Sequence, residues 1–159
     1  MNRVVIEEGD TAQIDAIAAK YGAIAALIHL HPLLNNREEE HSMLEQVFFL
    51  AKHLKPYLNE ASKQGHSCFV TVAHLDGELG TSGREYSPIT GGLFGLTKAL
   101  RWEWSSVFCR AIDLDKKLDA AVAVEHIIAE LHDPNRLIAE VGYSNKGRNT
   151  LEVRSSNNL

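Results

Sequence analysis

The feature that most constrains the fold of this chain is an amphipathic helix followed at once by an apolar strand. The helix is predicted over residues 88–104, where large side chains recur at helical spacing on one stripe: Leu93, Leu96, Thr97, Leu100 and Trp104. Ser87 is placed to cap this helix, and Pro88 takes the first helical position, where a missing N–H costs nothing. The run VFCRAIDLD that follows is apolar and β-branched, which favours a strand.

The rest of the chain repeats this alternation of strands and helices. Strands are predicted at Val4–Ile6 and over residues 23–33, 67–75, 107–115 and 136–143, and helices over residues 14–22, 38–62 and 119–132 in addition to the central one. Strands that alternate with helices predict βαβ units. The fold class is therefore α/β, a truncated Rossmann-like, doubly wound and mostly parallel sheet of about five strands with helices on both faces. The continuous apolar run at 23–33 predicts a strand buried on both faces. Pro56 predicts a kink in its helix or the end of the regular part of that helix.

Length and composition predict a single domain over residues 1–150, with residues 151–159 as a tail or linker. The formal net charge is −5 without a Lys/Arg cluster, which argues against nucleic acid or an anionic membrane as partner. No apolar run is long enough to span a membrane, and the N-terminus lacks the layout of a signal peptide, so a cytoplasmic protein is expected. Cys68 and Cys109 both fall in predicted strands and are expected to be buried, reduced thiols.

The motif GGLFGLTKALRWEW followed by CRAIDLD resembles a known family. It is similar to the structural, non-catalytic subdomain of the ketoreductase region of modular polyketide and polyunsaturated fatty acid synthases, a degenerate short-chain dehydrogenase-like fold. The upstream segments FFLAKHLKPYL and HLDGELG are similar to that family too. The resemblance implies that the chain stabilises an NADPH-dependent catalytic half that follows in the same polypeptide. The parent multienzyme would then have β-ketoacyl reductase activity.

A dinucleotide-binding fold needs a glycine-rich turn between its first strand and first helix, and the chain has no GxGxxG or Walker-type run. Its two glycine clusters, GELGTSG and TGGLFG, lie elsewhere. By resemblance, the segment that ends in the strand 23–33 matches the third to fourth strands of a short-chain dehydrogenase, so the first βαβ unit is absent. The sequence His29-Leu30-His31-Pro32 stands where that family has an NNAG-like motif. No cofactor is expected to bind this chain, and NADPH is assigned to the partner half.

The catalytic residues of short-chain dehydrogenases also lack a full counterpart. Their serine at the end of the fifth strand would correspond to the region of His74, where no hydroxyl stands. Their Tyr-x-x-x-Lys motif matches neither Phe94 with Lys98 nor Tyr86 with Thr90. No catalytic residue is therefore assigned, and the chain alone is predicted to be inactive. Two alternatives stay open: a small reductase that uses Tyr86, and a flavodoxin-like protein-interaction module.

Several polar side chains gather at the predicted carboxyl ends of the strands. His29 and His31 share one strand face, and His74, Asp76 and Asp113 follow neighbouring strands. A zinc site needs three or four converging ligands, and neither HExxH nor CxxC occurs, so no metal site is predicted. Two further acidic groups have structural interpretations: Asp115 at a strand end, and Glu38–Glu40 in the first turn of a helix.

The central helix also carries signs of a partner surface. Gly91 and Gly95 lie four residues apart, which predicts a close approach by another helix, within the domain or from a partner half. Phe48 and Phe49 are adjacent and cannot point the same way, and Phe94 lies off the apolar stripe, so part of this set is expected at the edge of the core or beyond it. The expected partner is the catalytic ketoreductase half, with self-association as the alternative for the isolated chain.

Overall fold

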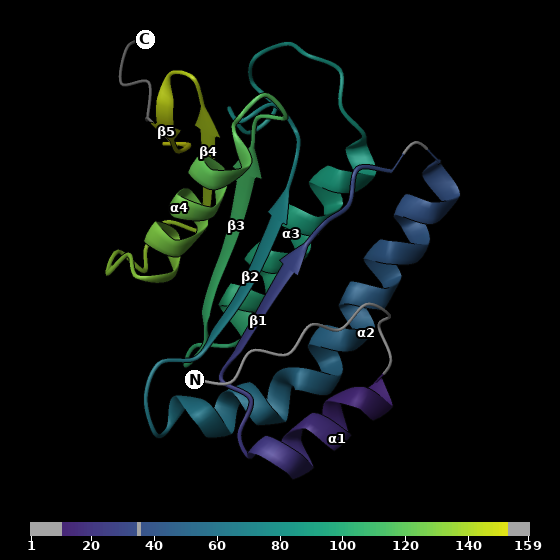
Figure 1. Cartoon of the computed structure of the whole chain (residues 1–159), viewed down its shortest axis with the longest axis vertical. Coiled ribbons are helices and arrows are strands. Elements are labelled where there is room, and N and C mark those ends of the chain that lie inside the picture. Colours follow the sequence, from purple (N-terminus) through teal and green to yellow (C-terminus); the bar gives the residue numbers. More distant parts are fainter. Residues whose placement is uncertain (1–10, 35, 153–159) are drawn as a thin grey trace, which may run out of the picture.

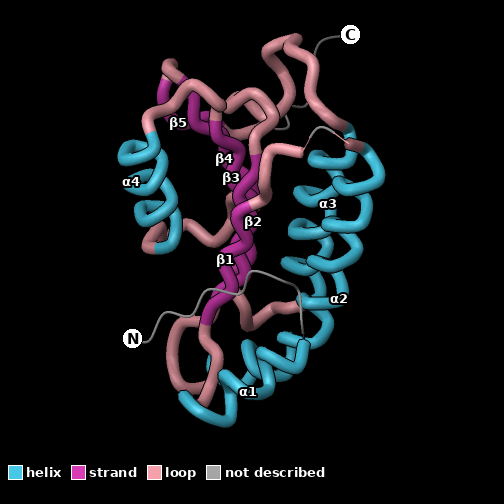
Figure 2. Tube along the Cα trace, turned by 45° about the vertical axis from the view of Figure 1, so that its right-hand side comes forward, coloured by secondary structure: helices cyan, strands magenta, loops and turns pink. Residues whose placement is uncertain are grey.

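The computed structural model describes residues 11–34 and 36–152 of the chain (Figure 1). One five-stranded sheet runs through the molecule in the order β1-β2-β3-β4-β5. The first four strands are parallel, and β5 pairs antiparallel with β4. Helices α1, α2 and α3 lie on one side of the sheet and α4 on the other (Figure 2). The described elements are α1 Thr11–Tyr21, β1 Ala26–Leu30, α2 Arg37–Ser62, β2 Cys68–Ala73, α3 Pro88–Glu103, β3 Phe108–Leu114, α4 Ala120–Leu131, β4 Glu140–Ser144 and β5 Gly147–Asn149.

The predicted fold class is confirmed, and so are the four predicted helices. The strand expected at Val4–Ile6 lies outside the described residues. The tail expected at 151–159 is described only at its first two residues, which have no regular structure. No helix of the described part is long and apolar enough to cross a membrane.

The prediction that the strand at 23–33 is buried on both faces is wrong. Strand β1 stands at the edge of the sheet and pairs only with β2 among the described strands. Ile28 and Leu30 on its α4-facing side are 39% and 62% exposed, because α4 covers β3 and β4 but does not reach β1. The central strands β2 and β3 are instead buried at every position.

The face covered by α2 and α3 carries the larger core. Helix α3 begins as the sequence predicts, with the Ser87 hydroxyl accepting from the N–H of Ile89 and Pro88 in the first turn. Its apolar stripe packs against α2 and against β2 and β3. Phe94, expected near the edge of the core, is instead buried in it at 4% exposure. Helix α2 continues through Pro56 and changes direction toward its C-terminal end (Figure 1), as an internal proline predicts.

The face covered by α4 carries a smaller apolar cluster, to which a buried ionic group is added. Arg110 of β3 is fully buried, donates to the carboxylate of Glu130 in α4, and lies 2.7 Å from a carboxylate oxygen of Asp133. Arg148 of β5 and the hydroxyl of Tyr143 in β4 donate to the same Glu130. Glu130 therefore ties α4 to three neighbouring strands.

Candidate functional site

The carboxyl ends of the parallel strands gather several chemically active side chains around a hollow. A cavity of about 100 Å³ opens there between the ends of β1, β2 and β3 and the first turns of α2 and α3. Its lining comes from all five elements or the loops next to them: His31, Pro32, Leu33, Leu34, Glu40, His74, Ser87, Thr90 and Lys116. This cavity occupies the edge at which ligands bind in open parallel sheets.

Two histidines lie at the end of β1, and one of them, His31, lines this cavity. The Nε2 atom of His29 lies 3.3 Å from the Nδ1 atom of His31, so one imidazole donates to the other. Burial lowers the pKa of His29 to about 4, and the nearby His31 adds to this. Burial also lowers the pKa of His31, against the opposing effect of Glu40. The imidazole of His29 is therefore neutral at pH 7. The Nε2 atom of His31 is buried and has no hydrogen-bond partner within the described chain.

Hydrogen bonds hold the side chains of the other cavity walls in place. The Nδ1–H of His74 donates to the carbonyl of Leu114 at 2.9 Å, because a carbonyl can only accept. Glu40 is buried at 6% exposure and accepts a hydrogen bond from the hydroxyl of Ser87. The same hydroxyl caps α3, so the α2 carboxylate and the α3 N-terminus are joined at this point.

The glycine-rich loop after β2 is organised around the carboxylate of Asp76. This side chain is 1% exposed and accepts hydrogen bonds from the backbone N–H groups of Glu78, Gly80 and Ser82, at 2.8–2.9 Å. Burial alone would raise the pKa of Asp76, but these backbone hydrogen bonds act against it, and the pKa lies well below its usual range. The loop therefore points its amides at a carboxylate of its own chain.

Asp113, at the end of β3, holds the beginning of the same loop. It is fully buried and accepts from the N–H groups of Leu75 and Leu79 at 2.7 and 2.9 Å. Burial raises the pKa of Asp113, although these backbone hydrogen bonds act in the opposite direction. Leu79 adopts a left-handed conformation with φ 59°, which places its N–H toward this carboxylate.

The approach of this loop to β4 requires glycine on both sides. A Cβ on Gly77 (φ +75°) would lie 2.3 Å from the carbonyl oxygen of Tyr143. A Cβ on Gly142 would lie 2.5 Å from the carbonyl oxygen of Gly77. The close backbone approach that glycines suggest therefore occurs in the HLDG segment. At Gly91 and Gly95 a Cβ would meet nothing within 4 Å, so the predicted close approach within the domain is wrong for this pair, and Gly92 faces Leu44 of α2 instead.

The residues matched to the short-chain dehydrogenase motif do not come together as a catalytic group. Lys98 forms an ion pair with Glu140 of β4, its Nζ 2.9 Å from the carboxylate, rather than standing free on a solvated helix face. Tyr86 is 40% exposed, and its hydroxyl rests against Gly80. Tyr86 lines a second hollow that shares Leu34, Glu40 and Ser87 with the cavity. Sequence reasoning did not single out Glu40 or Lys116 as cavity residues, since their place depends on how the helices and loops pack.

The described residues form neither a disulfide nor a metal site. Cys68 and Cys109 are both buried and free, as predicted, and burial raises the pKa of their thiols to about 11 and about 12. They belong to adjacent strands but pack into the two opposite cores, so they do not face each other. Within residues 11–34 and 36–152, no three His, Cys, Asp or Glu side chains are placed to hold a metal ion.

The fold is that of the short-chain dehydrogenases and reductases. A protein described as a short-chain dehydrogenase/reductase from Sinorhizobium meliloti 1021 superimposes with a TM-score of 0.55 at 14% identity, over 80% of this chain and 63% of that one. The KRED1-Pglu enzyme gives 0.54 at 14% identity, over 84% and 62%. A 3-ketoacyl-(acyl-carrier-protein) reductase from Brucella melitensis gives 0.50 at 19% identity, over 67% and 52%.

Sequence similarity points to a particular relative. The chain is 32% identical over 145 residues to a segment of a polyunsaturated fatty acid synthase from Thraustochytrium sp. (strain ATCC 26185 / S-3). The match covers 84% of this chain and 5% of that much longer synthase polypeptide. No protein-family model matches the chain. The predicted resemblance is confirmed: the chain is related to polyunsaturated fatty acid synthases through a segment with a reductase-like fold.

Proposed function

We propose that this chain is the non-catalytic structural half of a ketoreductase region in a polyunsaturated fatty acid or polyketide synthase, and that it stabilises the NADPH-dependent catalytic half of the same polypeptide. The observation that carries the proposal is the state of the residues that resemble the catalytic motif. Thr90 stands four residues after Tyr86, where a lysine is needed, and the lysine of the central helix is paired with Glu140. A tyrosine without a neighbouring ammonium lacks the group that lowers its pKa for proton transfer.

The glycine-rich loop supports the same proposal. A phosphate-binding loop needs backbone N–H groups that point at the ligand. Here the amides of Glu78, Gly80 and Ser82 donate to Asp76, whose negative charge would also repel a phosphate. We infer that the isolated chain binds neither NADPH nor NADH. Calorimetric titration with each cofactor should show no saturable heat, and binding in the low micromolar range would contradict the proposal.

A surface on the outer side of α2 and α3 supports the docking of a partner. Phe48 and Phe49 are 48% and 58% exposed, and their rings lie edge to face with centroids 5.5 Å apart. Leu44 contacts α3 at Gly92, and Phe48 lies one turn further along α2, on the same side. Gly91 and Gly95 have open space above them. We call Phe48, Phe49, Gly91 and Gly95 the outer helix surface.

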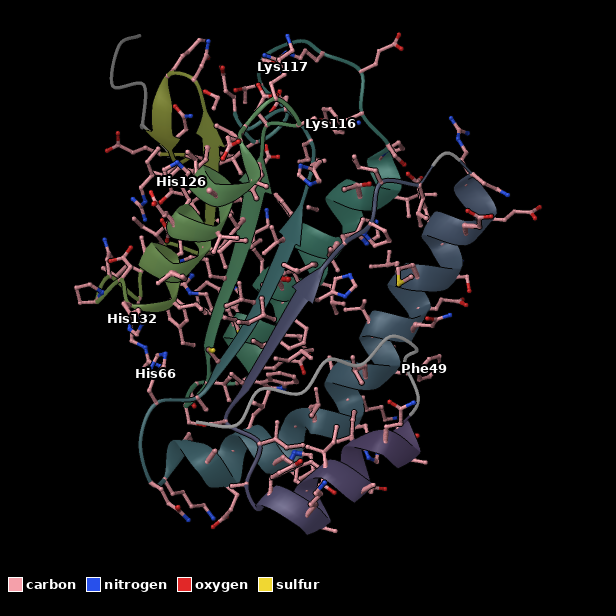
Figure 3. The ribbon with its side chains drawn as sticks, in the orientation of Figure 1. Phe49, His66, Lys116, Lys117, His126 and His132 are labelled. Atoms are coloured by element: carbon pink, nitrogen blue, oxygen red, sulfur yellow. The ribbon has the colours of Figure 1, made fainter. Side chains whose placement is uncertain are left out.

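Two properties of this surface suit another helix. Its two neighbouring aromatic rings expose an apolar patch, and exposed apolar patches mark protein interaction sites. Its glycines allow a second backbone to approach α3 closely, without a side chain between. The prediction that the glycines mark a helix approach therefore remains, now directed at a partner and not at this domain. Figure 3 shows Phe49 on the outer side of α2, directed away from the sheet.

The decisive experiment co-expresses the tagged chain with the catalytic ketoreductase half of the same polypeptide. The two halves should copurify, and Phe48→Glu should abolish this. Val124→Glu is the matched control, because Val124 is a similarly exposed apolar residue (53%) on α4, across the sheet. Wild-type halves that fail to copurify would refute the structural role. Equal disruption by Val124→Glu would refute the assignment of the surface.

A further inference from the structure

The two edges of the sheet differ in how well they are protected against pairing with another strand. At one edge, β5 spans only three residues, carries Arg148 and follows the exposed Lys146. At the opposite edge (Figure 1), β1 spans five residues, and no Asp, Glu, Lys or Arg occurs over residues 21–36. Short strands and charged side chains are means by which proteins block an edge, and β1 has neither device.

The backbone of β1 directs half of its hydrogen-bonding groups toward β2 and half toward the open edge. The N–H of His31 donates to the carbonyl of Val72 in β2. Because these groups alternate along a strand, the odd-numbered residues of β1 bond to β2. The N–H and C=O groups of Ala26, Ile28 and Leu30 therefore point to the other side, where the described chain places no strand.

The side chains at this edge are apolar or uncharged. Ile28 and Leu30 are 39% and 62% exposed, on the side of the sheet that carries α4. His29, on the opposite side, is neutral at pH 7, because burial lowers its pKa to about 4. The edge thus combines unpaired backbone groups with exposed apolar side chains. Such an edge suits the addition of another uncharged strand.

A second copy of β1 meets these requirements in one register. In an antiparallel pair centred on Ile28, this residue lies opposite its own copy, and Ala26 and Leu30 each lie opposite the other. These are the three residues with outward backbone groups, so every opposed pair can exchange two hydrogen bonds. A large side chain then lies beside a small one at both ends, and no like charges face each other. Pro32 lacks an N–H and limits the ladder to this length.

We propose that two copies of this chain associate through their β1 edges, antiparallel and centred on Ile28, so that the two sheets form one continuous sheet about a twofold axis. Such an interface closes on itself and gives a dimer, not a fibre. A strand of five residues buries less than a standard interface, so the dissociation constant should be on the order of 10–100 μM. The interface does not involve the outer helix surface, so it is independent of the proposed docking of the catalytic half.

The first test is sedimentation equilibrium of the full 159-residue chain at pH 7, over concentrations on both sides of this constant. Ile28→Lys should weaken the dimer by about tenfold or more, because two ammonium groups would face each other at the centre of the ladder. Val122→Lys is the matched control, because Val122 is also 39% exposed but belongs to α4, and it should leave the dimer unchanged. Phe48→Glu, on the outer helix surface, should leave it unchanged too.

Cysteine substitution tests the register. Ile28→Cys places two thiols on opposed residues, whose Cα atoms lie about 5.5 Å apart in such a pair, within the range of a disulfide. Leu30→Cys is the control: the side chain is more exposed, but its two copies would lie four residues apart along the ladder, about 14 Å, which is too far. Oxidation by copper–phenanthroline should therefore link Ile28→Cys chains faster than Leu30→Cys chains. The native thiols of Cys68 and Cys109 are buried in both variants.

Several results would overturn the proposal. A chain that stays monomeric over the whole series would do so, as would equal losses in Ile28→Lys and Val122→Lys. A loss in Phe48→Glu would move the contact to the outer helix surface. Faster linking of Leu30→Cys would indicate random collision or another register. Loss of copurification with the catalytic half in Ile28→Lys would mean that a strand of that half occupies the edge.

The two proposals can fail separately. Wild-type halves that do not copurify would refute the structural role and leave every readout on the isolated chain untouched. A monomeric chain that still copurifies with the catalytic half would refute the β1 dimer alone.

Discussion

The two faces of the sheet are stabilised in different ways. Under α2 and α3 the core is apolar, and its one buried polar contact between helix and sheet in the described chain joins the hydroxyls of Thr71 and Thr97 at 2.7 Å. Under α4 the apolar cluster is smaller. An ionic group near the C-terminal end of α4 joins Arg110 and Arg148 to Glu130 and Asp133.

The difference follows from how much helix each face receives. Two long helices side by side leave little of the first face open, so apolar contacts suffice there. Helix α4 is 12 residues long and stands alone on the second face among the described helices, with Val124 and Ile128 half exposed. Its position is set by the carboxylate of Glu130, which accepts from β3, β4 and β5 together. Burial would raise the pKa of Glu130, but the hydrogen bonds from Arg148, Tyr143 and Arg110 lower it overall.

The largest expected effect is on the α4 face. Arg110→Met should lower the free energy of unfolding by about 3–5 kcal/mol, because it leaves buried carboxylate charge without its cation. Urea denaturation measures this. The double variant Arg110→Met/Glu130→Leu should be more stable than Arg110→Met alone, because the uncompensated charge is gone. A loss below about 1 kcal/mol for Arg110→Met would mean that Arg148 alone compensates Glu130 and that the two faces do not differ as described.

The next effect belongs to the face under α2 and α3, and depends on pH. The pKa of His29 is about 4 in the folded chain, against 6.5 for an ordinary histidine, so below pH 6.5 the unfolded chain binds the extra proton. Stability from this group is full above pH 6.5 and is lost as the pH falls toward 4, by at most about 3 kcal/mol. His29→Leu should flatten the unfolding free energy over this window, whereas His41→Gln, an exposed histidine of α2, should not. Parallel pH profiles for wild type and His29→Leu would rule this out.

A smaller effect is expected at the buried threonine pair. Thr97→Val should cost about 1–3 kcal/mol, because the hydroxyl of Thr71 then loses its partner in a dry core. Thr71→Val/Thr97→Val should recover most of that loss, because no polar group remains unpaired. Additive costs in this double-mutant cycle, measured by urea denaturation, would show that the two hydroxyls do not depend on each other.

The smallest effect is expected on the outer side of α3. Gly95→Ala should raise the stability of the isolated chain by up to about 1 kcal/mol, because alanine is the better helix former and open space receives its methyl group. Gly92→Ala should gain less, since its Cβ would come within 3.1 Å of a Leu44 methyl. Thermal unfolding of both variants tests this. A lower melting temperature for Gly95→Ala would indicate that another part of the chain already packs on this glycine.

The local pattern of residues was enough to predict most of the fold. Ser87 and Pro88 mark the start of α3, the stripe from Leu93 to Trp104 is its buried side, and the apolar runs at 67–75 and 107–115 contain the two central strands. These features depend on neighbours within a turn or a strand, where backbone hydrogen bonding and periodicity decide the outcome. The absence of a glycine-rich phosphate motif and of Tyr-x-x-x-Lys could likewise be seen from the sequence alone.

Only the tertiary structure decided which surfaces of those elements are covered. The apolar run at 23–33 has the composition of a buried strand, but β1 lies at an edge that α4 does not reach, and burial depends on elements distant in the sequence. Gly77, and not Gly95, meets another backbone, because β4 happens to end beside the loop after β2. Arg110, in the middle of an apolar strand, donates a hydrogen bond to Glu130, twenty residues further along the chain. Glu40 and Lys116, from distant parts of the chain, line the same cavity. Such contacts arise from the packing of whole elements, which no local pattern records.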